Sequence, residues 1–250
     1  QAQQRLSFDF MNLYTPQGVL LASSWGETTS SDPTGVPAFD LPVAIAAGAG
    51  ASSAAQVQRL RQAELLALAP HLAPRLQIAL IPNQGASPSP RTLEDQALVI
   101  LTSQPVQGPQ GEALGWLRAG ILLNQNLGLI DHINHIVYPA GTLPLGSFGT
   151  ATLFLDDVRI TTNVQLFQNQ RAIGTRVSQA VHDAVLVRGE TWLDRAFVVN
   201  DWYVSGYQPL VDCAGQRVGM LYVGFLETPF RMTKYGILAL IVGLFVLAMV

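Results

Sequence analysis

Residues 98–123 read LVILTSQPVQGPQGEALGWLRAGILL, and residues 202–227 read WYVSGYQPLVDCAGQRVGMLYVGFLE. The two stretches align without a gap at an offset of 104, with seven identical positions. Four of these identities are Gly or Pro, which set turns and strand ends, so the shared property is a backbone shape. Each stretch predicts a strand, a Gly-containing turn and a second strand. The sequence therefore predicts a duplicated module. The identical pairs are Gln104/Gln208, Pro105/Pro209, Gly111/Gly215, Gly115/Gly219, Leu117/Leu221, Gly120/Gly224 and Leu122/Leu226.

An apolar run follows the second copy. From Tyr235 to Val250 the chain reads YGILALIVGLFVLAMV, sixteen residues without a charge. A membrane-spanning helix needs about 20 apolar residues, so we expect a transmembrane helix that is cut before its far end. Arg231 and Lys234 precede the run and can anchor it at the membrane surface. The alternative is a buried core helix, which normally keeps one polar side.

Composition restricts the class of protein. The 14 basic and 17 acidic residues nearly balance, which argues against nucleic acid as a partner. The single cysteine, Cys213, has no partner for an internal disulfide. The 250 residues suffice for two modules followed by a helix.

Similar elements are predicted in the two halves. Hairpins are expected at Phe8–Leu13 with Val19–Ala22, and at Ala151–Leu155 with Val158–Val164; aligning Leu13 with Leu153 makes them equivalent. Apolar spacing predicts helices over Ala54–Ala69, Leu127–Tyr138 (capped by Asn126) and Ser178–Val187. A further hairpin is expected at Arg195–Val199 with Trp202–Leu210, and Trp25–Ser53 reads as irregular.

The stretch Thr150–Glu227 resembles a Cache domain, the extracytoplasmic PAS-like module of bacterial histidine kinases, chemoreceptors and cyclases. The resemblance rests on GTATLFLDDVRITTNV, RAIGTRVSQAV, DWYVSGYQPLVD and GQRVGMLYVGFLE. With the duplication it implies an α/β (α+β) fold of two PAS-like Cache modules with antiparallel sheets, and residues 1–7 would be the last turns of an entering helix. We expect a membrane-distal module at 1–125, a connecting helix and loop at 126–145, a membrane-proximal module at 146–230 and a truncated transmembrane helix at 231–250.

A binding face is predicted on the second module. Alternate residues of a strand share a face, so Tyr203, Ser205 and Tyr207 should lie on one side and Trp202 and Val204 on the other. Phenols and hydroxyls on one face indicate a ligand pocket or, alternatively, a half-solvated sheet. A second polar row is expected from Arg159, Thr161 and Asn163.

The resemblance to citrate and dicarboxylate sensor kinases implies ligand contacts at Arg159, Thr162, Ser205 and Tyr207. Of these only Arg159 carries a positive charge, so a small monocarboxylate is expected rather than citrate. Arg171, Thr175 and Arg195 are further candidates, and the distal module around Asn12, Tyr14 and Trp25 is the alternative location.

The sequence gives less support for a catalytic site or a metal site than for a binding pocket. None of the G-x-S-x-G, H-E-x-x-H, P-loop and G-x-G-x-x-G motifs occurs in the sequence. Asp131, His132 and His135 form D-H-x-x-H but lack an evident third ligand, so a solvated helix face is expected. We expect no cofactor and no metal. His71 and His182 are expected at the surface, and Asp156 and Asp157 in a hairpin turn.

The sequence thus predicts the periplasmic part of a receptor in a bacterial inner membrane, homodimeric in its full length, that binds a small molecule. A sensor histidine kinase is favoured, with a chemoreceptor or diguanylate cyclase as the alternative output. The alternatives from other classes are a membrane-anchored enzyme using Asp201, Tyr203 and Tyr207, and a protein-interaction domain.

Overall fold

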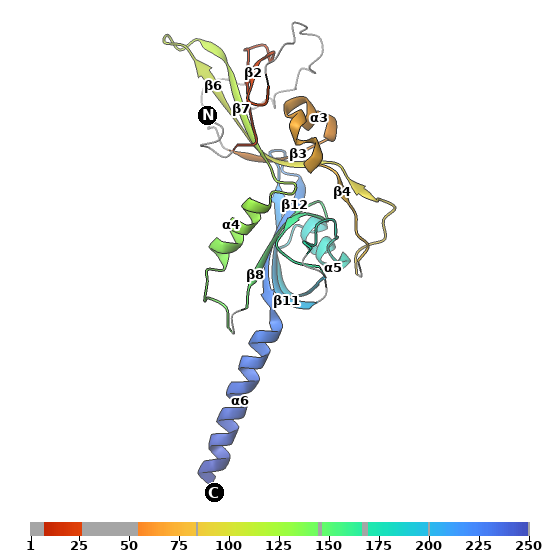
Figure 1. Ribbon diagram of the computed structural model, residues 1–250, viewed down its shortest axis with the longest axis vertical. Helices are drawn as coiled ribbons and strands as arrows, with labels where there is room; N and C mark the ends of the chain where they lie inside the picture. Colours follow the sequence, from red (N-terminus) through yellow and green to blue (C-terminus); the bar gives the residue numbers. More distant parts are fainter. Residues whose placement is uncertain are drawn as a thin grey trace. The chain divides into compact units, whose positions relative to one another are not determined.

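The computed structural model describes residues 8–26, 55–83, 85–144, 147–166, 170–199 and 201–249 (Figure 1). Residues 1–7 and 27–53, which include the predicted entering helix and most of the predicted irregular segment, lie outside this set. Contacts divide the chain into two compact units. Unit 1 contains Gln1–Ile78, Leu93–Asn124 and Val211–Val218, and unit 2 contains Ala79–Thr92, Gln125–Leu210 and Gly219–Val250.

The antiparallel sheet predicted for the second module is confirmed, and it has five strands. Its strands follow the order β10-β11-β12-β8-β9, and the pairs β10/β11, β12/β8 and β8/β9 are antiparallel. The bounds are β8 (Gly149–Leu155), β9 (Val158–Thr162), β10 (Trp192–Val198), β11 (Asp201–Val211) and β12 (Arg217–Leu226). Both predicted hairpins of this module are present.

The first sheet repeats this order. It runs β2-β1-β7-β6-β3, so β1, β2, β3, β6 and β7 occupy the places of β8, β9, β10, β11 and β12. The bounds are β1 (Phe10–Tyr14), β2 (Leu20–Ser23), β3 (Gln56–Leu60), β6 (Ala97–Gln107) and β7 (Ala113–Leu122). The register repeats too, because Leu13 lies opposite Leu117 as Leu153 lies opposite Leu221. The duplication predicted from sequence is therefore a duplication of backbone structure.

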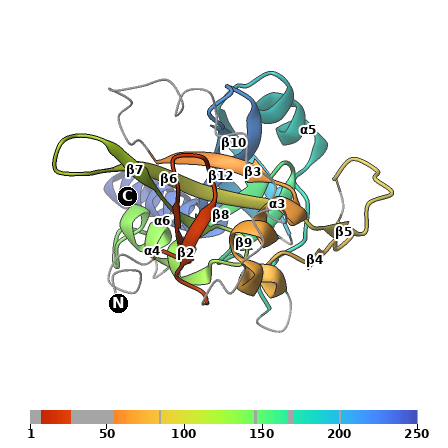
Figure 2. The ribbon, with the colours of Figure 1, turned by 90° about the horizontal axis from the view of Figure 1, so that it is seen from above.

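The predicted helix over Ala54–Ala69 is wrong in its first part. Residues Gln56–Leu60 form strand β3, which pairs with β6 (Figure 2), and only Gln62–Leu68 form helix α3. Pairing with β6 satisfies the backbone groups of β3, an interaction that local apolar spacing does not reveal. Helix α3 begins where the Glu64 carboxylate accepts a hydrogen bond from the Arg61 backbone N–H at 2.7 Å. A 3₁₀ turn, η1 (Pro70–Arg75), and the short strands β4 (Ile78–Ala79) and β5 (Leu93–Glu94) precede β6.

Helices pack on the sheet of unit 2. Helix α4 (Leu127–Val137) contacts β8 and β9, and Asn126 caps it by accepting a hydrogen bond from the Leu129 backbone N–H at 3.1 Å. Helix α5 (Gln179–His182) continues directly into a short π-helical segment, η4 (Asp183–Val187). Val181 and Val185 join the core formed with Tyr207, Met220 and Tyr222. The predicted helices at 127–138 and 178–187 are thus confirmed.

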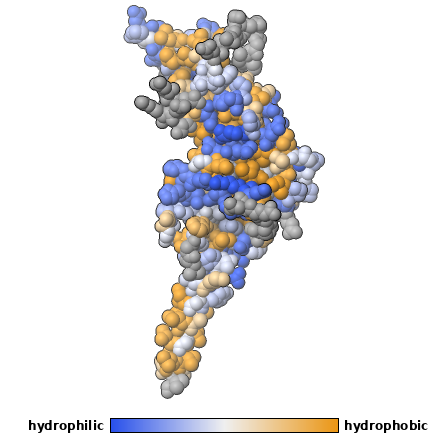
Figure 3. All heavy atoms as spheres, in the orientation of Figure 1, coloured by the Kyte–Doolittle hydropathy of each residue, from blue (hydrophilic) through white to orange (hydrophobic). Residues whose placement is uncertain are grey.

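Helix α6 (Glu227–Met249) follows β12 without a loop (Figure 1). It has 23 residues, and none of the candidate spanning window is buried against the rest of the protein. Figure 3 shows a mainly apolar surface over the C-terminal part of α6, whereas the part next to the sheet is more hydrophilic. A helix of this length and composition can cross a membrane, because 23 residues rise about 35 Å.

Removing residues 235–250 should leave the fold intact. The described residues of this run, 235–249, contribute no buried side chain, so the melting temperature of a chain ending at Lys234 should lie within about 2 °C of that of the full chain in detergent. Circular dichroism melting of both chains measures this. Unfolding of the shorter chain would show instead that the run is a core helix.

Candidate functional site

The predicted division of β11 into two faces is confirmed. Tyr203, Ser205 and Tyr207 are buried at 8%, 3% and 2% exposure, whereas Trp202 and Val204 are 46% and 38% exposed. The buried face is the one that packs against α5 and η4, since Tyr203 and Tyr207 belong to the same core as Val181. The polar groups of β11 therefore lie inside the module.

A bulge in β9 decides which of its polar side chains reach the same face. Leu153 lies opposite Thr161 and Phe154 opposite Arg159, so β9 contains one extra residue, Ile160. The bulge brings Arg159 and Thr162, three positions apart, to one side. The predicted polar row of Arg159, Thr161 and Asn163 is therefore wrong, because it assumed an uninterrupted alternation.

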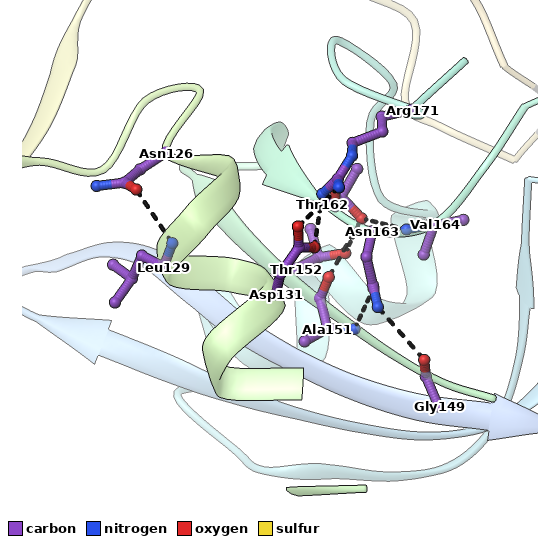
Figure 4. Close-up of polar contacts among 10 residues, drawn as sticks. All are labelled: Asn126, Leu129, Asp131, Gly149, Ala151, Thr152, Thr162, Asn163, Val164 and Arg171. Atoms are coloured by element: carbon purple, nitrogen blue, oxygen red, sulfur yellow. Dashed lines mark hydrogen bonds and ion pairs between the residues drawn. The ribbon is translucent and has the colours of Figure 1, made fainter. Parts of the chain in front are cut away.

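The side chains of Thr162 and Asn163 form hydrogen bonds at the end of the sheet (Figure 4). The hydroxyls of Thr162 and Thr152 are hydrogen-bonded at 2.6 Å, and Thr162 Oγ1 accepts from the Val164 backbone N–H at 3.0 Å. Asn163 Oδ1 accepts from the Ala151 backbone N–H at 2.7 Å. These bonds close the end of the β8–β9 ladder where regular pairing stops.

Arg159 is buried in this face with its charge unmatched. It is 3% exposed, and its Nη1 donates to the Thr175 hydroxyl at 2.6 Å. Its guanidinium carbon lies 5.2 Å from the centroid of the Phe154 ring, a cation–π contact. Its Nε has no hydrogen-bond partner, and among the described residues no carboxylate forms an ion pair with it. Burial lowers the pKa of Arg159, and the neighbouring Tyr207, Tyr222 and Tyr203 oppose this.

Two buried tyrosines lie beside Arg159. The Tyr207 ring is 4.7 Å from the Tyr222 ring and 6.1 Å from the Phe154 ring. Burial raises the pKa of Tyr207 to about 12, against the lowering effect of Arg159. Burial also raises the pKa of Tyr222, whose hydroxyl is hydrogen-bonded to that of Thr150 at 3.1 Å. At neutral pH both phenols are uncharged, so Tyr207 can donate a hydrogen bond to an acceptor next to Arg159.

A cavity of about 280 Å³ opens beside these groups within unit 2. Arg159, Tyr207 and Thr175 line it, but Thr162, Tyr203 and Ser205 do not, although they share the face. Arg176 also lines it, and its Nε donates to Asp157 Oδ2 at 2.8 Å, so its charge is matched. The remaining lining is mostly apolar: Ile81, Pro82, Asn83, Leu166, Val177, Ser178, Phe197, Val198 and Val199.

One wall of the cavity comes from residues 81–83, far from the other lining residues in sequence. The Ile81 backbone N–H donates to the Gly174 carbonyl at 2.9 Å. The Asn83 side chain accepts from the Arg176 backbone N–H at 2.9 Å and donates to the Arg176 carbonyl at 2.8 Å. The Gln179 N–H donates to the Gly85 carbonyl at 2.8 Å. This wall is not predicted by the sequence, because an isolated Pro-Asn pair gives no local signal of it.

The other candidates have different roles. Both Asp131 oxygens accept hydrogen bonds from Arg171 at 2.8 Å (Figure 4), so Asp131 joins α4 to the segment after β9. His132 and His135 are exposed, and in the described ranges no three His, Cys, Asp or Glu residues are grouped as metal ligands would be. Arg195 is exposed and donates to Glu227 at 2.7 Å.

The alternative location in the first module is occupied by structural contacts. The Asn12 amide donates to the Leu68 carbonyl at 2.9 Å and to the Tyr14 hydroxyl at 3.2 Å. Trp25 Nε1 donates to the same carbonyl at 2.8 Å. The bonds to Leu68 join Asn12 of β1, and Trp25 after β2, to the end of α3.

Comparison with known proteins gives one family. Residues 121–235 match the model described as "Single cache domain 3". No curated protein sequence matches the chain. Among solved structures, the periplasmic domain of Vibrio cholerae LuxQ is 14% identical with a TM-score of 0.42, and the match covers 90% of this chain and 76% of that one. The extracellular domain of the putative histidine kinase rpHK1S-Z16 is 11% identical, with a TM-score of 0.40 and coverages of 91% and 74%. The ligand-binding domain of the Pseudomonas aeruginosa chemoreceptor PctB with L-Gln is 12% identical, with a TM-score of 0.34 and coverages of 92% and 72%.

Proposed function

We propose that the chain is the extracytoplasmic sensor of a transmembrane receptor and binds a small monocarboxylate; the match of residues 121–235 to the single Cache domain 3 model supports the sensor role. The observation that carries the ligand proposal is Arg159, a buried cation without an acidic partner among the described residues, at the wall of a cavity. A buried unmatched charge is costly, and such costs persist mainly where a ligand offsets them.

The size and charge of the cavity define the ligand. A volume of about 280 Å³ is near the lower end of small-molecule sites. Arg159 supplies one unmatched positive charge, enough for one carboxylate, and Tyr207 supplies a neutral donor beside it. Of the described lining residues none is acidic, so an ammonium group would be left without a partner. A short aliphatic monocarboxylate is therefore favoured over an amino acid or a di- or tricarboxylate.

The route of the signal follows the strands. Tyr207 lies on β11, next to β12 in the sheet, and β12 leads directly into α6. A ligand that pulls Tyr207 toward Arg159 would shift this pair of strands. Helix α6 would move with them by about 1–2 Å, the size of shift that is common for helices in signalling transitions. The shift requires different ligand affinities in the two states. We place the receptor in a bacterial inner membrane as a homodimer, with a histidine kinase output favoured over a chemoreceptor or cyclase.

The membrane-anchored enzyme is less well supported. Of the described residues that line the cavity none is His, Asp or Glu, and the pKa of Tyr207 is raised to about 12. A group with that pKa is poorly matched to general acid–base catalysis near neutral pH.

A thermal-shift and calorimetry series tests the ligand class. Acetate, propionate and butyrate should stabilise the wild-type chain, whereas butylamine, glycine and citrate should not, because only the first set presents one carboxylate and no other charge. Tyr207→Phe removes one neutral hydrogen bond and should weaken binding by about 0.5–1.5 kcal/mol, or about two- to twelve-fold. Binding of citrate or glycine in preference to all three monocarboxylates would refute the proposed ligand class.

A further inference from the structure

An open groove of about 620 Å³ runs along the first turns of α6, within unit 2. Residues 141–144, from the segment between α4 and β8, line one side. Phe230, Lys234 and Ile237 of α6 line the other. This groove is separate from the cavity at Arg159, with which it shares no lining residue.

The groove lies at the polar-to-apolar boundary of α6. The uncharged run begins at Tyr235, so Lys234 directly precedes it and Ile237 lies inside it. At about 1.5 Å of rise per residue, these two residues differ by about 5 Å along the helix axis. Residues 141–144 face the same groove and therefore sit at this level too. If α6 crosses a membrane, this segment meets the bilayer surface.

The side chains around the groove suit the headgroup layer. Phe148 is 82% exposed and directly precedes Gly149, which lies opposite Phe225 at the end of β12. Phe230 and Tyr235 are also exposed, and aromatic side chains favour the membrane interface. Lys234 and the neighbouring Arg231 are exposed, and among the described lining residues none is acidic. Apolar walls with one lysine match an acyl chain next to a phosphate.

We propose that this groove binds an anionic phospholipid, with the phosphate at Lys234 and the first acyl carbons between Leu143 and Ile237. Residues 141–144 and Phe148 then form a second contact with the bilayer besides α6, and α4, which precedes them, contacts β8 and β9. The proposal rests on α6 crossing the membrane and is independent of the carboxylate site.

The test uses the full chain in lipid nanodiscs, with Cys213→Ser to remove the single native thiol. A polarity-sensitive fluorophore is attached at Thr142→Cys, and quenching by a lipid with a nitroxide near the headgroup is measured. Thr191→Cys is the matched control. Thr191 is exposed and lies just before the first residue of β10, and the other end of this strand, Val198, is about 20 Å away along the strand. Quenching at residue 142 should exceed that at residue 191 at least about two-fold, since interfacial segments enter the bilayer by about 5–10 Å. Equal quenching at the two positions overturns the proposal.

Lipid charge provides the second arm. Adding phosphatidylglycerol to phosphatidylcholine discs should increase quenching at residue 142, and Lys234→Gln should remove this increase. Arg231→Gln, which removes an equal charge one turn earlier but outside the groove lining, should retain it. Quenching that is unaffected by phosphatidylglycerol, or equally reduced by both variants, would show general adsorption of the segment and overturn the phospholipid site.

Discussion

Replacing Arg159 by alanine is expected to weaken binding of the favoured monocarboxylate by about 2–4 kcal/mol, or about 30- to 1,000-fold. The substitution removes a charge-assisted bond to a buried guanidinium, because Arg159 is the cavity-lining arginine without an ion pair in the described structure. Isothermal titration calorimetry measures the change. Arg188→Ala is the matched control, because Arg188 is exposed and pairs with Glu190 outside the cavity.

A second substitution at Arg159 distinguishes an effect on ligand binding from an effect on folding stability. Arg159→Met keeps most of the side-chain volume but removes the charge, so it should also lose binding while stabilising the ligand-free protein by about 1–3 kcal/mol. Urea unfolding without ligand measures this second effect. A ligand whose affinity is unchanged by Arg159→Ala would place the site elsewhere, first of all around Asn12, Tyr14 and Trp25.

Gly219→Ala is expected to destabilise the protein by about 3 kcal/mol. A Cβ at this position would lie 2.0 Å from the Phe154 carbonyl oxygen on β8, so the two strands would have to separate. Gly206→Ala is the matched control on the neighbouring strand, where the nearest atom is a flexible Leu193 methyl at 3.3 Å. That change should cost less than about 1 kcal/mol. Urea denaturation of both variants compares them.

The first module gives an internal check on this explanation. Gly115 is the repeat partner of Gly219, and a Cβ there would lie 2.2 Å from the Tyr14 carbonyl oxygen on β1, the strand equivalent to β8. Gly115→Ala should therefore show the same large cost. Equal stabilities of Gly219→Ala and Gly206→Ala would mean that β8 and β12 can separate at little cost.

The sequence by itself determined the repeat, the faces of β11 and the apolar helix. All three can be recognised from residue patterns in the sequence itself, without knowledge of tertiary contacts. Glycines at matched positions of the repeat mark the same close approach of two strands in both sheets. Alternation separates Tyr207 from Trp202, and the uncharged run that begins at Tyr235 leaves that part of α6 without a polar face. The alignment of Leu13 with Leu153 even fixed the register, because a strand shifted by one residue would turn its side chains to the wrong face.

Only the tertiary structure decided β3, the bulge and the cavity. Residues 56–60 have the apolar spacing of a helix but form a strand, because β6 offers pairing partners about 40 positions later in the chain. The bulge at Ile160 brings Thr162 rather than Thr161 to the face of Arg159, and a register shift depends on the partner strand. The wall at Ile81–Asn83 depends on hydrogen bonds to Gly174 and Arg176. Each of these features is a contact between segments distant in sequence, which local propensity does not encode.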